Sequence, residues 1–225
     1  MLVESQTSKL SHTRGADRPL LELTIGDLLH RTASQFPDHV SVSARHQSRR
    51  MTWAELSDSA DRVARGLWAL GIRRGDRVGL WSTNCIEWIM MHMGCARAGA
   101  ALVNVNPAYR SHELQYTLTR SRMKALFLWH KDKRADYEEI LGRARHGLEL
   151  TLEHVIYFDS PEWPAFLDAE GRLPEYVAVD DVANIQYTSG TTGLPKGVML
   201  THHNIVNNGQ FLAQGFHYTQ QDRIV

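Results

Sequence analysis

The segment Tyr187-Thr-Ser-Gly-Thr-Thr-Gly-Leu-Pro-Lys-Gly197 decides how the rest of the chain is interpreted. It contains four serine or threonine hydroxyls, three glycines, one lysine (Lys196) and no acidic residue. Glycine lets the backbone turn sharply and lets a ligand approach bare N–H groups. Hydroxyls and N–H groups donate hydrogen bonds to anionic oxygens, and a lysine adds a mobile positive charge. This composition predicts a loop that holds phosphate groups, with a plain flexible loop as the alternative.

The residues on either side of this segment are typical of β-strands. Val182–Gln186 alternates apolar and polar residues before it, and Val198–Leu200 is apolar after it. The segment is not a Walker loop, because Lys196 is followed by Gly197 and not by Ser or Thr, and it contains no G-x-G-x-x-G fingerprint. The residues alone therefore predict a phosphate loop between two strands and leave its ligand open.

The composition excludes other classes of function. The 225 residues are 43% apolar and 22% charged, as in ordinary globular proteins. Lys+Arg and Asp+Glu number 25 each, so no net field attracts nucleic acid or an anionic membrane. The longest apolar run, Cys85–Ala101, is interrupted by Glu87, His92 and Arg97. We therefore expect no nucleic-acid partner and no transmembrane segment.

The N-terminus and the cysteines indicate a reducing compartment. Met1–Leu10 lacks the apolar region of a secretory signal, and Glu4 with a lone Arg14 is atypical of a mitochondrial presequence. Cys85 and Cys95 are ten residues apart on one predicted helix, which places them on different sides and disfavours a bridge. We predict a cytoplasmic protein, with the mitochondrial matrix as the less favoured location.

Alternating strands and helices predict an α/β fold with a mainly parallel sheet flanked by helices. Strands are expected at 40–44, 49–52, 76–81, 101–105, 124–129, 154–158, 182–186 and 198–200, and helices at 20–30, 53–70, 85–98, 111–121, 134–145 and 202–214. Thr24, Thr52, Asn84 and Ser111 are the expected N-caps. Residues 1–18 are predicted to be a disordered tail and residues 159–181 an irregular connection. Because ligands of such sheets bind beyond the carboxyl ends of the strands, the loop after 184–188 is suitably placed.

Two further patterns do not predict a site. The adjacent His202 and His203 would point about 100° apart on a helix, and no third ligand follows at metal spacing. Packing at the start of the helix, beside the ligand of the phosphate loop, is the preferred interpretation of this pair. Ser189 does not lie in a G-x-S-x-G elbow, so a hydrolase nucleophile is not expected there.

The segment 187–197 resembles the phosphate-binding signature of the adenylate-forming (AMP-binding) enzymes, which include acyl-CoA synthetases, luciferases and adenylation domains of peptide synthetases. The resemblance continues into Thr201-His202-His203-Asn204 and covers about residues 20–225. Val103–Pro107, Arg110–Leu114 and Asn204–Asn208 are most similar to fatty acyl-CoA synthetases of the medium- to long-chain type. Residues 19–225 are therefore expected to be the N-terminal part of an AMP-binding domain.

The resemblance implies a ligase of fatty acid metabolism that uses ATP, Mg²⁺ and CoA. A carboxylate attacks the α-phosphate of ATP to give an acyl-adenylate and pyrophosphate, and the CoA thiol then displaces AMP. Lys196 and Thr191 are the implied catalytic residues, with Thr191 near Mg²⁺; a solvated lysine is the alternative for Lys196. The implied nucleotide-binding residues are Thr188, Ser189, Gly190, Thr191, Thr192, Gly193, Lys196 and Gly197.

Other parts of the family pattern are not found in these 225 residues. The family has a glutamate ligand for Mg²⁺, an adenine-binding loop, a Thr-Gly-Asp ribose contact and a C-terminal domain with a catalytic lysine. The resemblance therefore implies the N-terminal part of an acyl-CoA ligase, and we expect the chain alone to be inactive. The alternatives are a non-catalytic fragment and an adenylation domain of a peptide synthetase.

Overall fold

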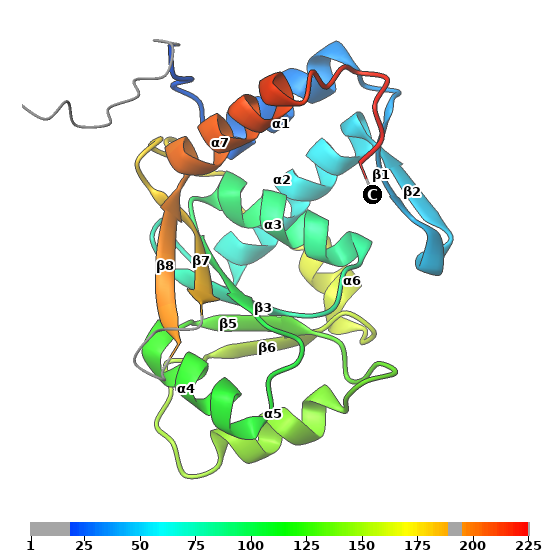
Figure 1. The fold of residues 1–225 in the computed structure, drawn as a ribbon. Helices are drawn as coiled ribbons and strands as arrows, with labels where there is room; N and C mark the ends of the chain where they lie inside the picture. The colour runs from blue at the N-terminus through cyan, green and yellow to red at the C-terminus, as the bar shows by residue number, and fades with distance from the viewer. Residues whose placement is uncertain (1–18, 189–194, 225) are drawn as a thin grey trace, which may run out of the picture.

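A computed structural model describes residues 19–188 and 195–224 of the chain. Within these ranges the chain forms a six-stranded sheet with helices on both faces and a separate two-stranded sheet (Figure 1). The predicted tail, residues 1–18, lies outside the described residues and stays a prediction. No described helix has the combination of length and apolar character that crossing a membrane requires.

The larger sheet has the strand order β6-β5-β3-β4-β7-β8. Its strands are β3 (Arg77–Trp81), β4 (Ala101–Val105), β5 (Ala125–Leu128), β6 (His154–Tyr157), β7 (Val182–Thr188) and β8 (Lys196–Thr201). All neighbours are parallel except β7 and β8, which form an antiparallel hairpin. The central strands are nearly continuous apolar runs, as burial on both faces requires. The predicted α/β class with a mainly parallel sheet is confirmed.

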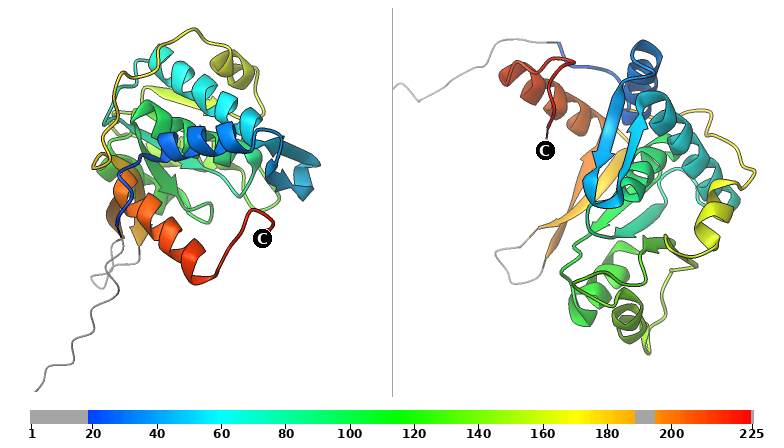
Figure 2. Two further views of the ribbon diagram at one scale, coloured as in Figure 1. Left: turned by 90° about the horizontal axis from the view of Figure 1, so that it is seen from above. Right: turned by 90° about the vertical axis from the view of Figure 1, so that its right-hand side faces the viewer.

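Helices cover the two faces of this sheet (Figure 2). They are α1 (Ile25–Gln35), α2 (Trp53–Ala69), α3 (Ile86–Ala98), α4 (Ser111–Ser121), α5 (Tyr137–Arg145), α6 (Glu162–Leu167) and α7 (His202–Gly215), with a 3₁₀ turn η1 (Arg45–Gln47). One buried cluster joins α2, α3 and α6 to one face of the sheet, and a second joins α4 and α5 to the other. The small sheet pairs β1 (Val40–Ala44) with β2 (Arg49–Thr52), as predicted.

Two of the predicted N-caps are confirmed and two are wrong. Thr24 and Thr52 each form a capping box with the acidic residue three positions later. At α3 the N-cap is Cys85, whose Sγ accepts from the Trp88 N–H, and not Asn84. At α4 the N-cap is Arg110, because the Glu113 carboxylate accepts its backbone N–H at 3.1 Å; Ser111 is the first helical residue.

Two other segments differ from the sequence-based prediction. Helix α5 begins at Tyr137, three residues later than expected, because Asp132 Oδ1 accepts the N–H groups of Arg134 and Ala135 and holds a turn there. The connection 159–181 contains the short helix α6, whose Trp163 and Phe166 pack edge-on and tilted against Phe127 of the sheet. Apolar anchoring therefore orders part of a segment that its prolines and glycine had suggested was irregular.

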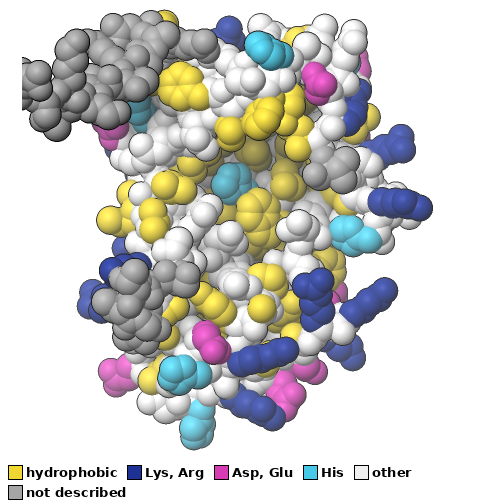
Figure 3. All heavy atoms as spheres, in the orientation of Figure 1, with side chains coloured by type: hydrophobic (Ala, Val, Ile, Leu, Met, Phe, Trp, Pro, Cys, Tyr) yellow, Lys and Arg dark blue, Asp and Glu magenta, His cyan; other side chains and the backbone are white. Residues whose placement is uncertain are grey.

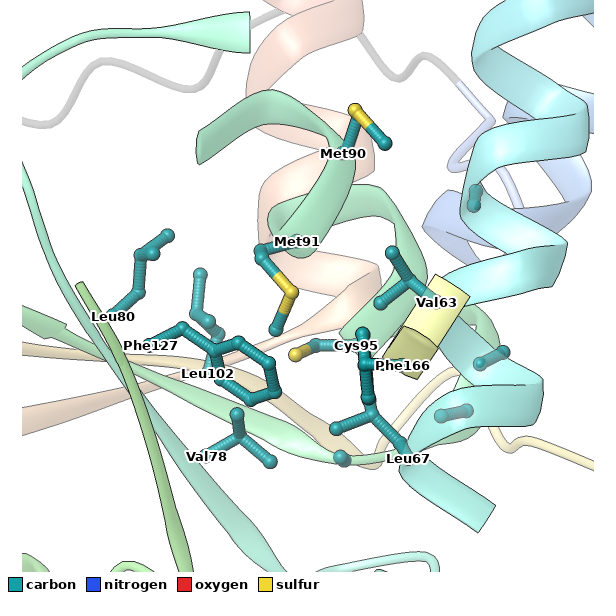
Figure 4. Packing of buried hydrophobic residues seen from close by; sticks show 14 of the residues in the cluster. Val63, Leu67, Val78, Leu80, Met90, Met91, Cys95, Leu102, Phe127 and Phe166 are labelled. Carbon is teal, nitrogen blue, oxygen red and sulfur yellow. The ribbon is translucent and has the colours of Figure 1, made fainter. Parts of the chain in front are cut away.

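Helices α2 and α3 pack closely against each other. A Cβ added at Gly94 of α3 would lie 2.2 Å from Val63 Cγ1 and 2.4 Å from Val63 Cβ. Figure 4 shows Val63 of α2 directed toward α3, above Cys95. Glycine at position 94 thus lets the two helix backbones approach each other. Cys85 and Cys95 are both buried and free.

Candidate functional site

The predicted phosphate loop closes the hairpin formed by β7 and β8. Thr188 at the end of β7 pairs with Lys196 at the start of β8, and Tyr187 pairs with Gly197. β7 itself runs parallel to β4, so the hairpin opens at the carboxyl end of the parallel sheet. The flanking strands predicted at 182–186 and 198–200 are confirmed and are each slightly longer than expected.

The hairpin brings together two of the predicted site residues. Thr188 and Lys196 face each other across the mouth of the loop, and both are exposed to solvent. Gly197 follows, where a Cβ would lie 3.3 Å from Ile185 Cγ2. The remaining predicted residues, Ser189, Gly190, Thr191, Thr192 and Gly193, lie outside the described residues. Their roles therefore stay predictions.

Helix α4 holds the downstream end of the loop in place. The Tyr116 hydroxyl donates to the carbonyl oxygen of Pro195 at 3.1 Å, one residue before Lys196. The Tyr116 ring also packs edge-on against Tyr187 of β7, with 6.4 Å between ring centroids. Sequence reasoning missed Tyr116, since nothing in the pattern of a half-buried helix signals a contact 79 residues away.

The Thr-His-His-Asn motif after β8 joins the last helix to the first. Thr201 caps α7, and its hydroxyl accepts the Asn204 N–H at 3.1 Å. His202 is fully buried, and its Nδ1 accepts the backbone N–H of Ile25 at 3.2 Å. Asn207 accepts from and donates to the backbone of Leu21. The expected packing role of the motif at the helix start is confirmed, while its position beside a nucleotide stays a prediction.

His92 of α3 and the buried His202 of α7 are close enough for their charges to interact. His92 of α3 stacks on Trp88, and its Nδ1 has no hydrogen-bond partner among the described residues. Burial, with a smaller contribution from His202, lowers the pKa of His92 to about 4. Burial also lowers the pKa of His202, against the opposing effect of Asp181 and Asp27. Both rings are therefore neutral in the folded protein at pH 7.

We expect acidification from pH 7 to pH 5 to destabilise the fold through His92. The unfolded ring takes up a proton near its ordinary pKa of 6.5, whereas the folded ring does so only near 4. The stabilisation that the neutral His92 ring provides is therefore fully present above pH 6.5, and it is lost progressively as the pH falls toward 4. Linkage gives a loss of about 2 kcal/mol by pH 5. Urea unfolding at both pH values measures it.

His92→Phe is the matched variant for this measurement. It keeps an aromatic ring against Trp88 but cannot take up a proton. Carboxylates that also titrate affect both proteins equally, so the difference between their pH slopes isolates His92. Equal slopes in the two proteins would contradict this assignment.

The chain was compared with known proteins. Residues 29–225 match the family described as AMP-binding enzyme. The chain is 34% identical over 232 residues to the mouse protein named medium-chain acyl-CoA ligase ACSF2, mitochondrial, covering 91% of this chain and 38% of that protein. It is 36% identical over 220 residues to acyl-CoA ligase sidI of Aspergillus fumigatus, covering 90% of this chain and 37% of that protein.

Solved structures give the same result. The fold superposes on a fatty acyl CoA synthetase of Mycobacterium tuberculosis with a TM-score of 0.70 and 31% identity, over 80% of this chain and 34% of that one. A long-chain-fatty-acid-CoA ligase, FadD1, of Archaeoglobus fulgidus gives a TM-score of 0.79 and 27% identity, over 95% of this chain and 44% of that one.

A mainly parallel α/β sheet with a glycine-rich hairpin loop at its carboxyl edge defines the class of adenylate-forming folds. The chain belongs to the AMP-binding enzyme family. It spans less than two fifths of the length of the two acyl-CoA ligases named above.

Proposed function

We propose that the chain is the N-terminal part of an AMP-forming acid–thiol ligase that activates a fatty acid with ATP and transfers the acyl group to CoA. The observation that carries this proposal is the hairpin geometry. Thr188 and Lys196 are cross-strand partners at the carboxyl end of a parallel sheet, on either side of a glycine-rich segment. The medium-chain and fatty acyl relatives support the class of acid.

The chemistry needs stabilisation of the negative charge that develops on departing pyrophosphate. When bound, ATP supplies the phosphorus that the carboxylate attacks. On the protein side, Lys196 offers a mobile cation and Thr188 a hydroxyl donor, both exposed and both anchored to paired strands. Tyr116 restrains the backbone next to Lys196 through the carbonyl oxygen of Pro195. We propose Ser189, Gly190, Thr191, Thr192, Gly193 and Gly197 as the other nucleotide contacts.

The described hairpin residues suit the negatively charged phosphates of a metal–nucleotide complex. The exposed Lys196 lies next to no carboxylate that would neutralise it within the described hairpin. Among the described residues, no group of three His, Cys, Asp or Glu side chains is suited to hold a metal ion by itself. We therefore propose that Mg²⁺ is held with the nucleotide and that Thr191 lies near it. We also propose a cytoplasmic location. The mouse relative is named mitochondrial, so the two locations need to be distinguished by experiment.

Incubation with ATP, Mg²⁺, CoA and octanoate or palmitate tests the proposed function. A version extended past Val225 to the length of its relatives is expected to form AMP, pyrophosphate and acyl-CoA only when the fatty acid is present. The 225-residue chain alone is expected to form no acyl-CoA. Pyrophosphate exchange stimulated by an amino acid and not by fatty acids would instead support the peptide-synthetase alternative.

A further inference from the structure

A cationic cleft lies on the α4 side of the hairpin. Its volume is about 450 Å³, and it is lined by the end of α4, the start of β3 and the faces of β7 and β8. Three arginines line it, Arg77, Arg120 and Arg122, and Lys196 stands at its hairpin wall. Arg77, Arg120 with Arg122, and Lys196 come from three distant parts of the sequence, so the cleft exists only in the folded chain.

The described carboxylates do not pair with the positive charges in this cleft. No aspartate or glutamate lines the cleft, and within residues 19–188 and 195–224 no carboxylate forms an ion pair with any of the four cations. Some other arginines of the fold are paired with carboxylates; for example, Arg74 binds Asp181, and Arg97 binds Asp61 at 2.7 Å. Positive charges gathered in one cleft repel each other. An anion bound between them offsets this repulsion.

Ser121 provides a second, independent observation. It lines the same cleft and is only 5% exposed, yet its Oγ has no hydrogen-bond partner among the described residues. Buried hydroxyls are nearly always hydrogen-bonded, and an unpaired one calls for an explanation. An anionic oxygen bound in the cleft would give the Ser121 hydroxyl an acceptor. The aromatic pair Tyr116 and Tyr187 lies beside the same space.

We propose that this cleft is a second anion site that binds a phosphate-bearing ligand. Guanidinium groups match phosphate oxygens in a bidentate manner, which a cluster of three arginines can exploit. The phosphate is either a free anion, such as pyrophosphate, or part of a nucleotide whose base contacts the tyrosine rings. The site is separate from the loop contacts of the proposed function, although Lys196 borders both.

Arg122 offers a variant that removes charge without disturbing the fold. It is the C-cap of α4 and has a φ of 51°, in the left-handed region that favours glycine. Arg122→Gly therefore keeps the backbone conformation and is expected to unfold at the same temperature as the parent chain or a higher one. Arg120→Gln is the second variant. Arg143→Gln on α5 is the control, because Arg143 pairs with Glu139 away from the cleft.

Calorimetric titration of the 225-residue chain at low ionic strength tests the proposal. Pyrophosphate and adenosine 3′,5′-bisphosphate are the two probes. Arg122→Gly and Arg120→Gln are each expected to weaken binding about fivefold or more, while Arg143→Gln leaves it unchanged. Tighter binding of the bisphosphate identifies a nucleotide as the source of the phosphate, and equal or weaker binding identifies a free anion.

Three results would overturn the second site. These are no binding of either probe to the unaltered chain, equal binding to the parent and both cleft variants, and equal losses in the cleft and control variants. Lys196→Ala separates this proposal from the proposed function. If only that variant loses pyrophosphate, the anion is held by the loop, so the cleft proposal fails while the proposed function stands.

Discussion

Replacing Lys196 by alanine in a version long enough to catalyse the reaction is expected to slow pyrophosphate release about 100-fold. Lys196 is the cation that the hairpin presents at the mouth of the loop, directly across from Thr188. Removing it leaves the charge that develops on the departing pyrophosphate without its mobile counterion. The effect belongs to the first half-reaction, so it is measured as fatty-acid-dependent pyrophosphate release with CoA omitted.

The control for this variant is Lys133→Ala. Lys133 is also an exposed lysine, but it lies in the turn before α5 and does not belong to the hairpin. Its removal changes the net charge equally and should leave pyrophosphate release within about twofold of the parent rate. Because Lys196 is exposed, both variants should unfold at the temperature of the parent protein. An unchanged rate in Lys196→Ala would remove this residue from the proposed mechanism.

Gly94→Ala is expected to lower the free energy of unfolding by about 3 kcal/mol. The added methyl group would lie 2.2 Å from Val63 Cγ1 and 2.4 Å from Val63 Cβ, well inside van der Waals contact. Val63 is fully buried, so it cannot move aside without displacing α2 from α3 (Figure 4). Urea unfolding followed by circular dichroism measures the loss.

Gly142→Ala provides the matched control for this prediction. Gly142 also lies within a helix, α5, but a Cβ there meets nothing within 4 Å. The same substitution should raise the free energy of unfolding by up to about 1 kcal/mol, because alanine is the better helix former. If both variants were destabilised to the same degree, the loss in Gly94→Ala could not be assigned to the α2–α3 contact, because a change in helix propensity would stabilise both.

Local signals in the sequence were sufficient to predict most of the helices and strands. Thr24 and Thr52 are followed by acidic residues three positions later, and both capping boxes form because their partners lie within one helical turn. The buried strands are apolar runs between turn residues and were found for that reason. At α3 and α4 the sequence did not distinguish the N-cap from its neighbour, because that depends on backbone geometry. The N-caps are Cys85 and Arg110.

The parts that the sequence did not predict depend on distant contacts. Helix α6 is ordered by Trp163 and Phe166 packing against Phe127 of β5, which a window of neighbouring residues does not reveal. Tyr116 reaches Pro195 across 79 positions. The cationic cleft likewise combines residues from α4, β3 and β8. The residues proposed for the phosphate loop lie within one continuous segment and could be proposed from the sequence, whereas contacts such as Tyr116 to Pro195 could not.

Apolar side chains remain exposed on the last elements of the chain. Val198 and Met199 on β8 and Phe211, Leu212 and Phe216 on or just after α7 are among the exposed large hydrophobic residues. Figure 3 shows hydrophobic side chains gathered on the face of the molecule over which α7 and α3 lie. The cleft, which Met199 also lines, therefore borders exposed apolar surface of the kind that another segment or partner can cover.

The contact between α1 and α7 has a consequence for the order of events during synthesis. Leu21 is bound by Asn207, 186 positions later, and Ile25 by His202. On the ribosome, the segment that becomes α1 must therefore wait until nearly all of these residues have been translated before its backbone groups find their final partners. Until then the backbone groups of Leu21 and Ile25 lack these partners, although Leu29 of α1 can already pack against α2 and α3.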